Sequence, residues 1–489
     1  MSNLKVSRRG FIVGCSAAIA AMAGARLTQV ALASPDGPDA PNYETIVVVF
    51  LRGGWDALNV LVPLGGNDRG YYEIYRGQLK VPLTGTPNYS GALALANATS
   101  NGTPLGFHPG LAPLMDLYQQ GALAVVCAAG LTSDTRSHFD AQQFMELGTP
   151  GVKTTAGGWL TRHLMSSPNL PASIFLPALS TGSGTTVSLS GYQQAVALSG
   201  VGGFNYRPPW DDKIYTPMKA ALRQMYSING SSWLHQAGSE TLDALDVING
   251  VAGDYKPGGG ANYQGGLAGS LKTVAQLIKA DLGVRTATVD FGGWDTHENQ
   301  QFGNGDPRGY FFDHLTEMAN AFKAFYMDLA STNHHQRTTL VLMSEFGRRV
   351  RENSNRGTDH GHGNAMFVLG GGVNGGRVYG SWPGLSNQQL YQGDDVAITT
   401  DYRTVLAEII SKRAGNPNVA TVFPGFNYAG PMGIVNEPAA NLLPIVTLTP
   451  GPSPTTGPTA TSGPSPTPGV NPTVNPAFKN KAYMPLVQK

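Results

Sequence analysis

The sequence contains almost no cysteine and has no excess of either charge. Only Cys15 and Cys127 occur among 489 residues, and 33 Lys and Arg stand against 32 Asp and Glu. So few thiols exclude a disulfide-rich scaffold, and the stability must come from a hydrophobic core. The balanced charge predicts no nucleic-acid partner, because a surface that binds a polyanion needs a basic excess.

The N-terminal segment lacks the roughly 20 uninterrupted apolar residues that a membrane-spanning helix needs. Its apolar core, residues 12–25, contains glycine and serine. It follows the arginine pair Arg8-Arg9 and precedes the small-residue sequence Ala31-Leu32-Ala33. This order is typical of a twin-arginine signal peptide, here residues 1–33, cleaved after Ala33. The alternative is an arginine pair that precedes a buried helix by chance.

The predicted export sets the expected compartment, and cleavage sets the net charge and cysteine content of the mature chain. We expect the twin-arginine translocase to carry the folded protein out of the cytoplasm, to the periplasm, the cell surface or the medium. Cleavage removes four basic residues and no acid, which leaves a net charge of −3. It also leaves Cys127 as the single cysteine, so no intrachain disulfide can form.

The rest of the chain divides into one long region and a biased tail. Residues 40–445 are long enough for a substantial core, and within them residues 180–270, rich in Gly, Ser, Asn and Tyr, are predicted to form an insertion or cap. Residues 449–476 are mostly Pro, Thr, Ser and Gly and contain no charged residue, which predicts a disordered linker. The tip, residues 477–489, is either a cell-surface attachment signal or an unstructured tail.

Apolar runs without a polar face alternate with helical patterns in the long region. The helical pattern is clearest over residues 313–329. Strands buried on both faces alternate with helices in α/β folds, so we predict a mainly parallel sheet flanked by helices. The predicted strands are residues 45–51, 123–128, 286–290, 339–343 and 366–369.

Polar motifs follow these strands, where the loops of a parallel sheet converge on a ligand. Asp295 and His297 form one cluster, and Asp359, His360 and His362 form another among glycines. Carboxylate oxygen and imidazole nitrogen suit Zn, Mn or Fe, which predicts a divalent metal site of one or two ions. The alternative is a hydrogen-bonded loop without metal.

Six motifs together resemble the bacterial domain-of-unknown-function 1501 (DUF1501) family over about residues 40–435. Members of that family are typically twin-arginine exported and uncharacterised, and it is grouped with the alkaline phosphatase and sulfatase superfamily. The resemblance therefore implies an alkaline phosphatase-like core. The motifs are RGGWDALN (52–59), DTRSHF (134–139), GWDTH (293–297), SEFGR (344–348), GTDHGHG (357–363) and TDYR (400–403).

The resemblance also implies roles for particular residues, because that superfamily uses two metals and a Ser or Thr nucleophile at a helix N-terminus. Asp56 matches the aspartate that holds the second metal. Asp295 and His297 match the pair that holds the first metal, and His362 matches its third ligand. Ser137 is the expected nucleophile, with Thr135 and Ser133 behind it. A helix N-cap without chemistry is the alternative for Ser137.

This chain departs from the superfamily pattern at two points. Glu345-Phe346 stands where an aspartate and histidine pair is usual, so Glu345 is a candidate ligand and one imidazole is missing. His360 or Asp359 could fill that place. The first-metal pair is also spaced more closely than in phosphatases, which leaves one ion, or none, as an alternative to two.

Four arginines beside the motifs could grip a phosphate or sulfate bidentately, and Arg136 is the first choice for a catalytic one. Each could instead pair with a neighbouring acid. The other three, with His138, are the expected substrate-binding residues: Arg52, Arg348 and Arg403.

Three hypotheses for the function follow. The leading one is an exported, metal-dependent hydrolase of phosphate or sulfate esters, on a small molecule or a glycan. The second is a non-catalytic binding or structural protein of the cell surface that keeps the phosphatase-like fold. A glycan-processing enzyme without metal ranks last, because no clear pair of acids is present.

Overall fold

A computed structural model describes residues 43–438, apart from residues 169, 171–173, 202–211, 228–232, 252 and 254. The predicted signal peptide (1–33), linker (449–476) and tip (477–489) lie outside the described residues. Among the helices in the described part of the chain, none has the length and apolar character needed to cross a membrane.

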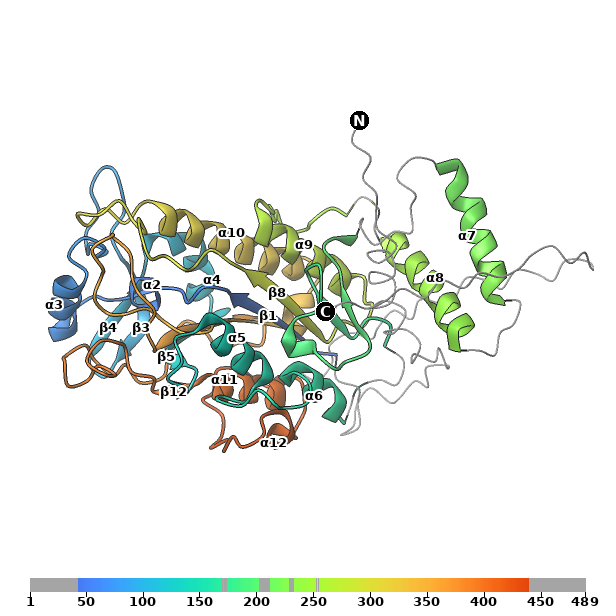
Figure 1. Cartoon of the computed structure of the whole chain (residues 1–489). Coiled ribbons are helices and arrows are strands. Elements are labelled where there is room, and N and C mark those ends of the chain that lie inside the picture. The colour runs from blue at the N-terminus through green and yellow to red at the C-terminus, as the bar shows by residue number, and fades with distance from the viewer. Residues whose placement is uncertain are drawn as a thin grey trace, which may run out of the picture. The chain divides into compact units, whose positions relative to one another are not determined.

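A nine-stranded mixed sheet forms the centre of the fold (Figure 1). The strand order is β11-β5-β10-β9-β1-β8-β6-β7, and β12 also pairs with β5. β10 is antiparallel to both of its neighbours, whereas every other pairing in this sheet is parallel. The strands are β1 (Thr45–Leu51), β5 (Leu123–Gly130), β6 (Ala178–Ser180), β7 (Ala195–Ala197), β8 (Thr286–Phe291), β9 (Thr338–Ser344), β10 (Asn364–Gly370), β11 (Val378–Tyr379) and β12 (Thr400–Asp401).

The prediction of an α/β fold with a mainly parallel sheet is confirmed. All five predicted strands are present, as β1, β5, β8, β9 and β10, and the predicted helix over 313–329 is α10 (Tyr310–Ala330). The reversed direction of β10 was not predicted. Nor were the remaining strands of the sheet, which are only two or three residues long and too short to show a period.

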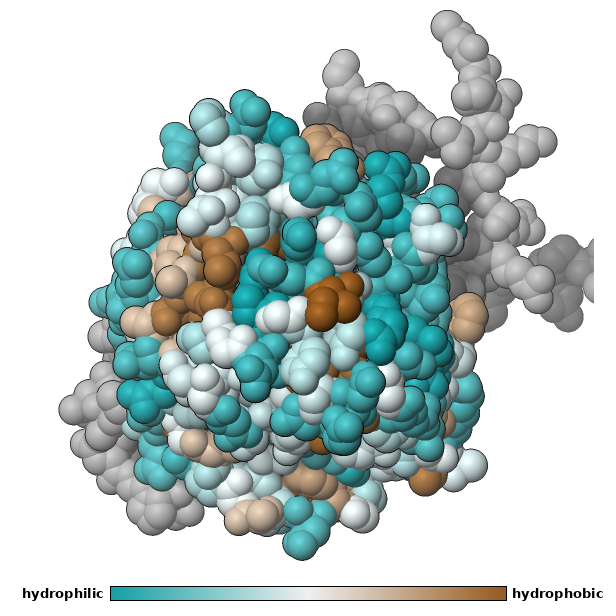
Figure 2. All heavy atoms as spheres, turned by 90° about the vertical axis from the view of Figure 1, so that its left-hand side faces the viewer, coloured by the Kyte–Doolittle hydropathy of each residue, from teal (hydrophilic) through white to brown (hydrophobic). Residues whose placement is uncertain are grey.

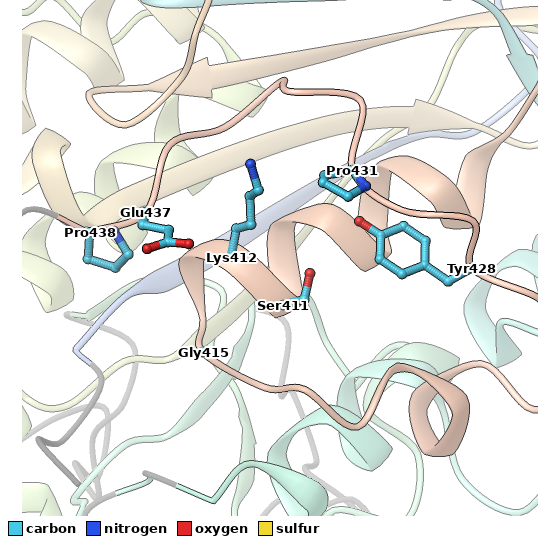
Figure 3. Close-up of a pocket in the computed structure, with 7 residues that line it drawn as sticks. All are labelled: Ser411, Lys412, Gly415, Tyr428, Pro431, Glu437 and Pro438. Carbon is cyan, nitrogen blue, oxygen red and sulfur yellow. The ribbon is translucent and has the colours of Figure 1, made fainter. Parts of the chain in front are cut away.

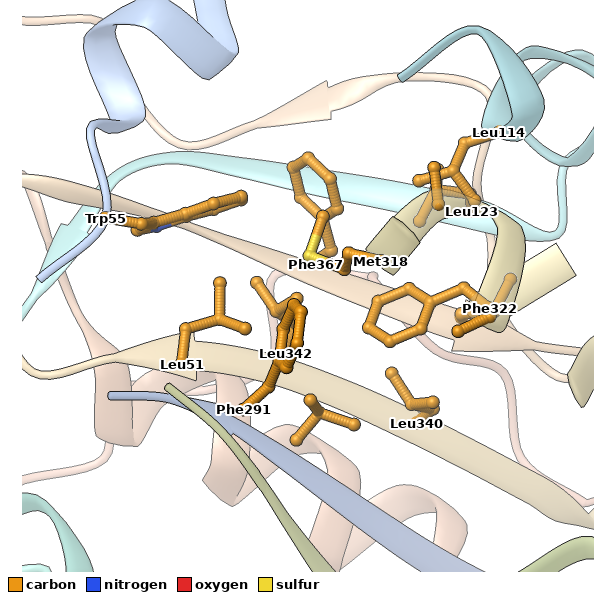
Figure 4. Close-up of a cluster of buried hydrophobic side chains, with 14 of the residues drawn as sticks. Leu51, Trp55, Leu114, Leu123, Phe291, Met318, Phe322, Leu340, Leu342 and Phe367 are labelled. Carbon is orange, nitrogen blue, oxygen red and sulfur yellow. The ribbon is translucent and has the colours of Figure 1, made fainter. Parts of the chain in front are cut away.

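Both faces of the sheet are covered, which explains why its strands are apolar throughout. Val47 and Val49 of β1 pack in one hydrophobic cluster with side chains of α10 and α9 (Gly266–Lys279), and Figure 4 shows part of this cluster. Ile46 and Val48 point to the other face, against three further helices. These are α5 (His138–Leu147), α6 (Trp159–Ser166) and α11 (Tyr402–Glu408).

Smaller elements complete the fold. A three-stranded antiparallel sheet has the order β2-β4-β3 and was not predicted. The described residues of the predicted insertion, 180–270, include two long helices that ion pairs such as Arg223 to Asp243 join. They also include β7, which belongs to the large sheet. The remaining bounds are β2 (Leu61–Pro63), β3 (Leu93–Ser100), β4 (Thr103–Phe107), α2 (Ala57–Val60), α3 (Gly66–Tyr75), α4 (Met115–Gln119), α7 (Asp212–Ser227), α8 (Trp233–Val251), α12 (Val419–Val422), the 3-10 helices η1 (Pro109–Leu114), η2 (Val187–Leu189) and η4 (His334–Arg337), and the π-helix η5 (Ile409–Arg413).

Candidate functional site

Five loops meet at one edge of the large sheet. The parallel strands β1, β5, β8 and β9 end there, and because β10 runs the opposite way, its beginning lies at the same edge. The segment 359–363, just before β10, is thereby brought to the loops that follow the other strands. Strand direction therefore assembles motifs that are far apart in the sequence.

The turn after β1 approaches the loop after β8 very closely at Gly53. Its φ of +126° lies in a region that favours glycine, and a Cβ there would come 2.5 Å from the backbone nitrogen of Asp295. The amide of Gly53 donates to Glu345 Oε1 over 2.9 Å. This glycine therefore lets three loops meet at one point.

Three imidazoles surround one carboxylate oxygen at this edge, and we call Asp295, His138, His297 and His360 the Asp295 cluster. From Asp295 Oδ1 the distances are 3.4 Å to His138 Nε2, 3.0 Å to His297 Nε2 and 3.1 Å to His360 Nε2. The Nε2 atoms of His297 and His360 are themselves 3.0 Å apart. Potential ligand atoms of His138, Asp295 and His360 all lie within 4.8 Å of one another.

The other nitrogen of each imidazole faces an oxygen that accepts hydrogen bonds. With the proton on Nδ1, a neutral imidazole directs its Nε2 lone pair at Asp295 Oδ1, whereas a protonated imidazole donates from Nε2. The hydrogen bond to Glu345 raises the pKa of His138 and so favours the protonated form of that ring. Lone pairs that converge on a carboxylate oxygen repel it unless a proton or a cation lies between them. The distances are 2.7 Å from His138 Nδ1 to Glu345 Oε1, 2.8 Å from His360 Nδ1 to the carbonyl oxygen of Arg136, and 3.2 Å from His297 Nδ1 to Asp359 Oδ1.

The two carboxylates that contact His138 are both favoured in the ionised form. Burial acts to raise the pKa of Asp295, but the hydrogen bond and charge of Arg348 outweigh it, and the pKa falls to about 2. Burial likewise acts to raise the pKa of Glu345, yet hydrogen bonds from His138 and Gln142 lower it below its ordinary value. The site therefore offers a charged oxygen beside the imidazoles.

Arg348 holds Asp295 in position from inside the protein, where a substrate cannot reach it. Its side chain is fully buried, and it donates to Asp295 Oδ1 over 2.6 Å. It also donates to the carbonyl oxygens of Gly54 and Thr358, over 2.5 and 2.7 Å. These bonds fix the position of Asp295 relative to the β1 turn and the 359–363 segment.

The other three predicted arginines also have acidic partners, the alternative that the sequence left open. Arg403 belongs to the first turn of α11, and Arg52 follows β1. None of these guanidinium groups is directed freely toward the Asp295 cluster. The distances to carboxylate oxygens are 2.8 and 3.0 Å from Arg52 to Asp290 and Glu146, 2.5 Å from Arg136 to Asp395, and 2.6 Å from Arg403 to Asp401.

Asp56, the predicted ligand of a second metal, is not brought into the cluster. Its side chain is fully buried and forms a bidentate ion pair with Arg76, itself fully buried. Gln300 donates to Asp56 Oδ2 over 2.7 Å. A carboxylate neutralised in this way stabilises the turn after β1 and has no open side for an ion.

His360, and not His362, contacts Asp295. His362 stacks on Tyr391, with ring centroids 4.0 Å apart, and burial lowers its pKa to about 4. His360 is held in place by a backbone bridge to Arg348. Two histidines separated by one glycine look equivalent in the sequence, and this pairing decides between them.

Ser137 lies next to the cluster but serves as the N-cap of α5. Its hydroxyl accepts from the amide of Asp140 at 3.4 Å, and its own amide donates to Thr135 Oγ1 over 3.2 Å. Ser133 follows β5 in the same loop. The cap makes His138 the first residue of α5 and so directs its imidazole into the site.

Sequence reasoning missed that His138 belongs with the imidazole cluster, and it missed the residues that hold the cluster in place. His138 was expected to bind substrate, although its position after a Ser N-cap at the end of β5 was a usable signal. Gln142 lies one helical turn further on and donates to Glu345 over 2.8 Å. Asn353 donates to Asp359 over 3.1 Å, and no motif indicated it.

Two other parts of the surface lack the chemistry of this site. A pocket beside η5, lined by Lys412, Tyr428 and Glu437 among others, contains no residue of the Asp295 cluster (Figure 3). Figure 2 shows the face on the side of α3, which is mostly hydrophilic, with one group of adjoining hydrophobic residues and a separate one near the centre of the view. The Asp295 cluster is therefore the candidate functional site, because it brings three imidazoles and a carboxylate close together.

The comparisons with known proteins point to one family. Residues 270–413 match the model of the family described as "Protein of unknown function (DUF1501)". The match supports the DUF1501 resemblance and includes Asp295, His297, Glu345 and His360. No curated protein matches the chain.

Proposed function

We propose that this chain is an exported, metal-dependent hydrolase of phosphate or sulfate esters, with a divalent ion bound by the Asp295 cluster. The observation that carries the proposal is the convergence of three imidazole Nε2 atoms on one carboxylate oxygen. Each of these imidazoles has an oxygen acceptor on Nδ1, the pattern found around metal-bound histidines.

The donor set fits Zn, Mn or Fe, which accept imidazole nitrogen and carboxylate oxygen together. Three imidazoles and one carboxylate match one ion. The buried ion pair of Asp56 with Arg76 supports one ion in preference to two. When bound, such an ion polarises an ester oxygen and lowers the pKa of water.

Residues around the proposed ion would hold its ligands in position. Arg348 holds Asp295, and Glu345 holds the proton of His138 Nδ1. His297 and Asp359 form the solvent-facing part, with side chains 44% and 52% exposed. A substrate therefore approaches from the side of His297, and Ser137 remains a candidate nucleophile beside His138.

An alkaline phosphatase-like core and export belong to the same proposal. The core is supported by the six motifs in order and by a site at the carboxyl edge of a mostly parallel sheet. Export is supported by the arginine pair, apolar core and cleavage sequence of residues 1–33. The compartment is then extracytoplasmic.

Turnover of p-nitrophenyl phosphate and p-nitrophenyl sulfate tests the proposal. The wild type should lose activity on chelation and regain it with one of the three ions. Asp295→Ala and His360→Ala should stay inactive after the same treatment, whereas His362→Ala should recover. Hydrolysis that survives both chelation and Asp295→Ala would refute a metal-dependent site.

One observation favours the second candidate, a non-catalytic binding protein of the cell surface. The four arginines expected at the substrate are all bonded to carboxylates or carbonyls, and Ser137 is occupied as an N-cap. A protein that binds one ion tightly but hydrolyses neither ester would support this candidate.

A further inference from the structure

We propose that Arg349 receives the negatively charged group of an anionic ester at the rim of the Asp295 cluster. This inference rests on the proposed function and names the residue that selects for charge. Arg349 belongs to none of the six sequence motifs, and its neighbour Arg348 is fully buried.

The backbone places Arg349 beside the exposed part of the cluster. Its amide donates to the carbonyl oxygen of Asp359 over 3.0 Å, and it forms a backbone bridge with Asp395. Asp359 in turn contacts His297 Nδ1. Arg349 therefore lies between the segment that holds His297 and the loop that contains Asp395.

The guanidinium of Arg349 is the least committed of those near the site. Its side chain is 40% exposed, and its carboxylate partner, Asp394, lies 3.5 Å away. Among the described residues no side-chain hydrogen bond of Arg349 is formed, in contrast to Arg52, Arg136, Arg348 and Arg403. A guanidinium with unused donors can bind a phosphate or sulfate through two parallel hydrogen bonds.

Acidic residues lie on both sides of Arg349. Its amide bonds to the carbonyl oxygen of Asp359, and its backbone bridges to Asp395. The charge of Arg349 acts on Asp395, where burial is the larger effect and raises the pKa. Arg349 is therefore close to the acids on both sides of the rim and is positioned to balance charge that a substrate brings.

Calorimetric titration of inorganic phosphate and of sulfate into the metal-loaded protein tests the assignment without turnover. The wild type is compared with Arg349→Ala and Arg349→Lys. The control is Arg308→Ala, since Arg308 is also a 41% exposed arginine beside an aspartate, Asp306, but is not part of the site.

We expect Arg349→Ala to weaken the binding of phosphate and of sulfate about 10-fold or more, because the variant loses a charge-assisted pair of hydrogen bonds. Arg349→Lys should keep part of the binding.

The outcomes separate this inference from the proposed function. Weakened binding in Arg349→Ala, with unchanged metal content and unchanged binding in Arg308→Ala, supports the inference. Equal binding in the wild type and Arg349→Ala overturns it and leaves the metal centre intact. A metal-loaded wild type that binds neither anion also overturns it, whereas a wild type that takes up no metal refutes the proposed function itself.

Discussion

Two aspartates follow neighbouring parallel strands and have opposite surroundings. Asp56 follows β1, is fully buried and is neutralised by Arg76. Asp295 follows β8, has a side chain that is 48% exposed, and lies among three imidazoles whose Nε2 atoms face it. The same residue type at the same edge of a sheet thus forms a buried ion pair in one place and presents an exposed carboxylate to three imidazoles in the other. The difference lies in the partner that each loop supplies.

The largest expected effect is the loss of the ion when Asp295 is replaced. Asp295→Ala removes the oxygen on which the imidazoles converge, so ion affinity should fall by more than the roughly 100-fold that follows loss of a residue that only orients a ligand. Metal titration with a competing chelator measures this. Because Arg348 loses a partner as well, folding is checked by circular dichroism. Unchanged ion affinity in a folded Asp295→Ala variant would show that Asp295, like Asp56, does not bind the ion.

Asp56→Ala should act on stability and not on the ion. It leaves the buried guanidinium of Arg76 without its carboxylate, which costs about 3–5 kcal/mol of the free energy of unfolding. Urea denaturation measures the loss. Asp290→Ala is the matched control, because Asp290 pairs with Arg52 while 48% exposed, and should cost less than about 1 kcal/mol. Equal losses would show that burial is not the deciding factor.

Glu345→Gln sharpens the comparison within the cluster. Glu345 is buried and contacts His138 Nδ1 over 2.7 Å, so in the proposed metal site it would orient a ligand without being one. The glutamine keeps the shape but removes the charge, and ion affinity should fall by roughly 10- to 100-fold. The same chelator titration, at constant stability by urea denaturation, separates this from unfolding. A complete loss of the ion would instead make Glu345 a ligand.

The last prediction concerns a histidine outside the cluster, and it extends the comparison to imidazoles. Burial lowers the pKa of His163 to about 4, and Asn416 donates to its Nδ1 over 3.1 Å. Between pH 6.5 and 4 the unfolded chain binds a proton that the folded chain does not, so stability falls as the pH falls through this range, by roughly 2–3 kcal/mol. His163→Gln should flatten this part of the pH–stability curve. An unaltered curve would contradict the assignment.

The sequence predicted the sheet well because strands buried on both faces are mostly apolar, and β1, β5, β8, β9 and β10 are long enough to show it. It could not predict the direction of β10, which depends on pairing with β5 and β9 and not on composition. That direction brings His360 to the site.

The sequence also predicted that the loops after these strands would meet, and they do, but it could not predict which of their side chains make contact. Asp295 and His297 were correctly grouped as neighbours. The choice between His360 and His362, and the pairing of Asp56 with Arg76, depend on contacts between segments far apart in the chain. The resemblance implied that Asp56 and His362 bind metal ions. In this structure Asp56 pairs with Arg76 instead, and His362 stacks on Tyr391.

Elemental analysis of the folded, purified chain, compared with His360→Ala and His362→Ala, tests the central claim most directly. The two variants remove the same kind of side chain two positions apart, and of the two histidines His360 contacts Asp295 whereas His362 stacks on Tyr391. The account predicts about one zinc, manganese or iron per chain in the wild type and in His362→Ala, and its loss in His360→Ala. A folded wild type without metal, or an ion lost from His362→Ala and kept by His360→Ala, would contradict it.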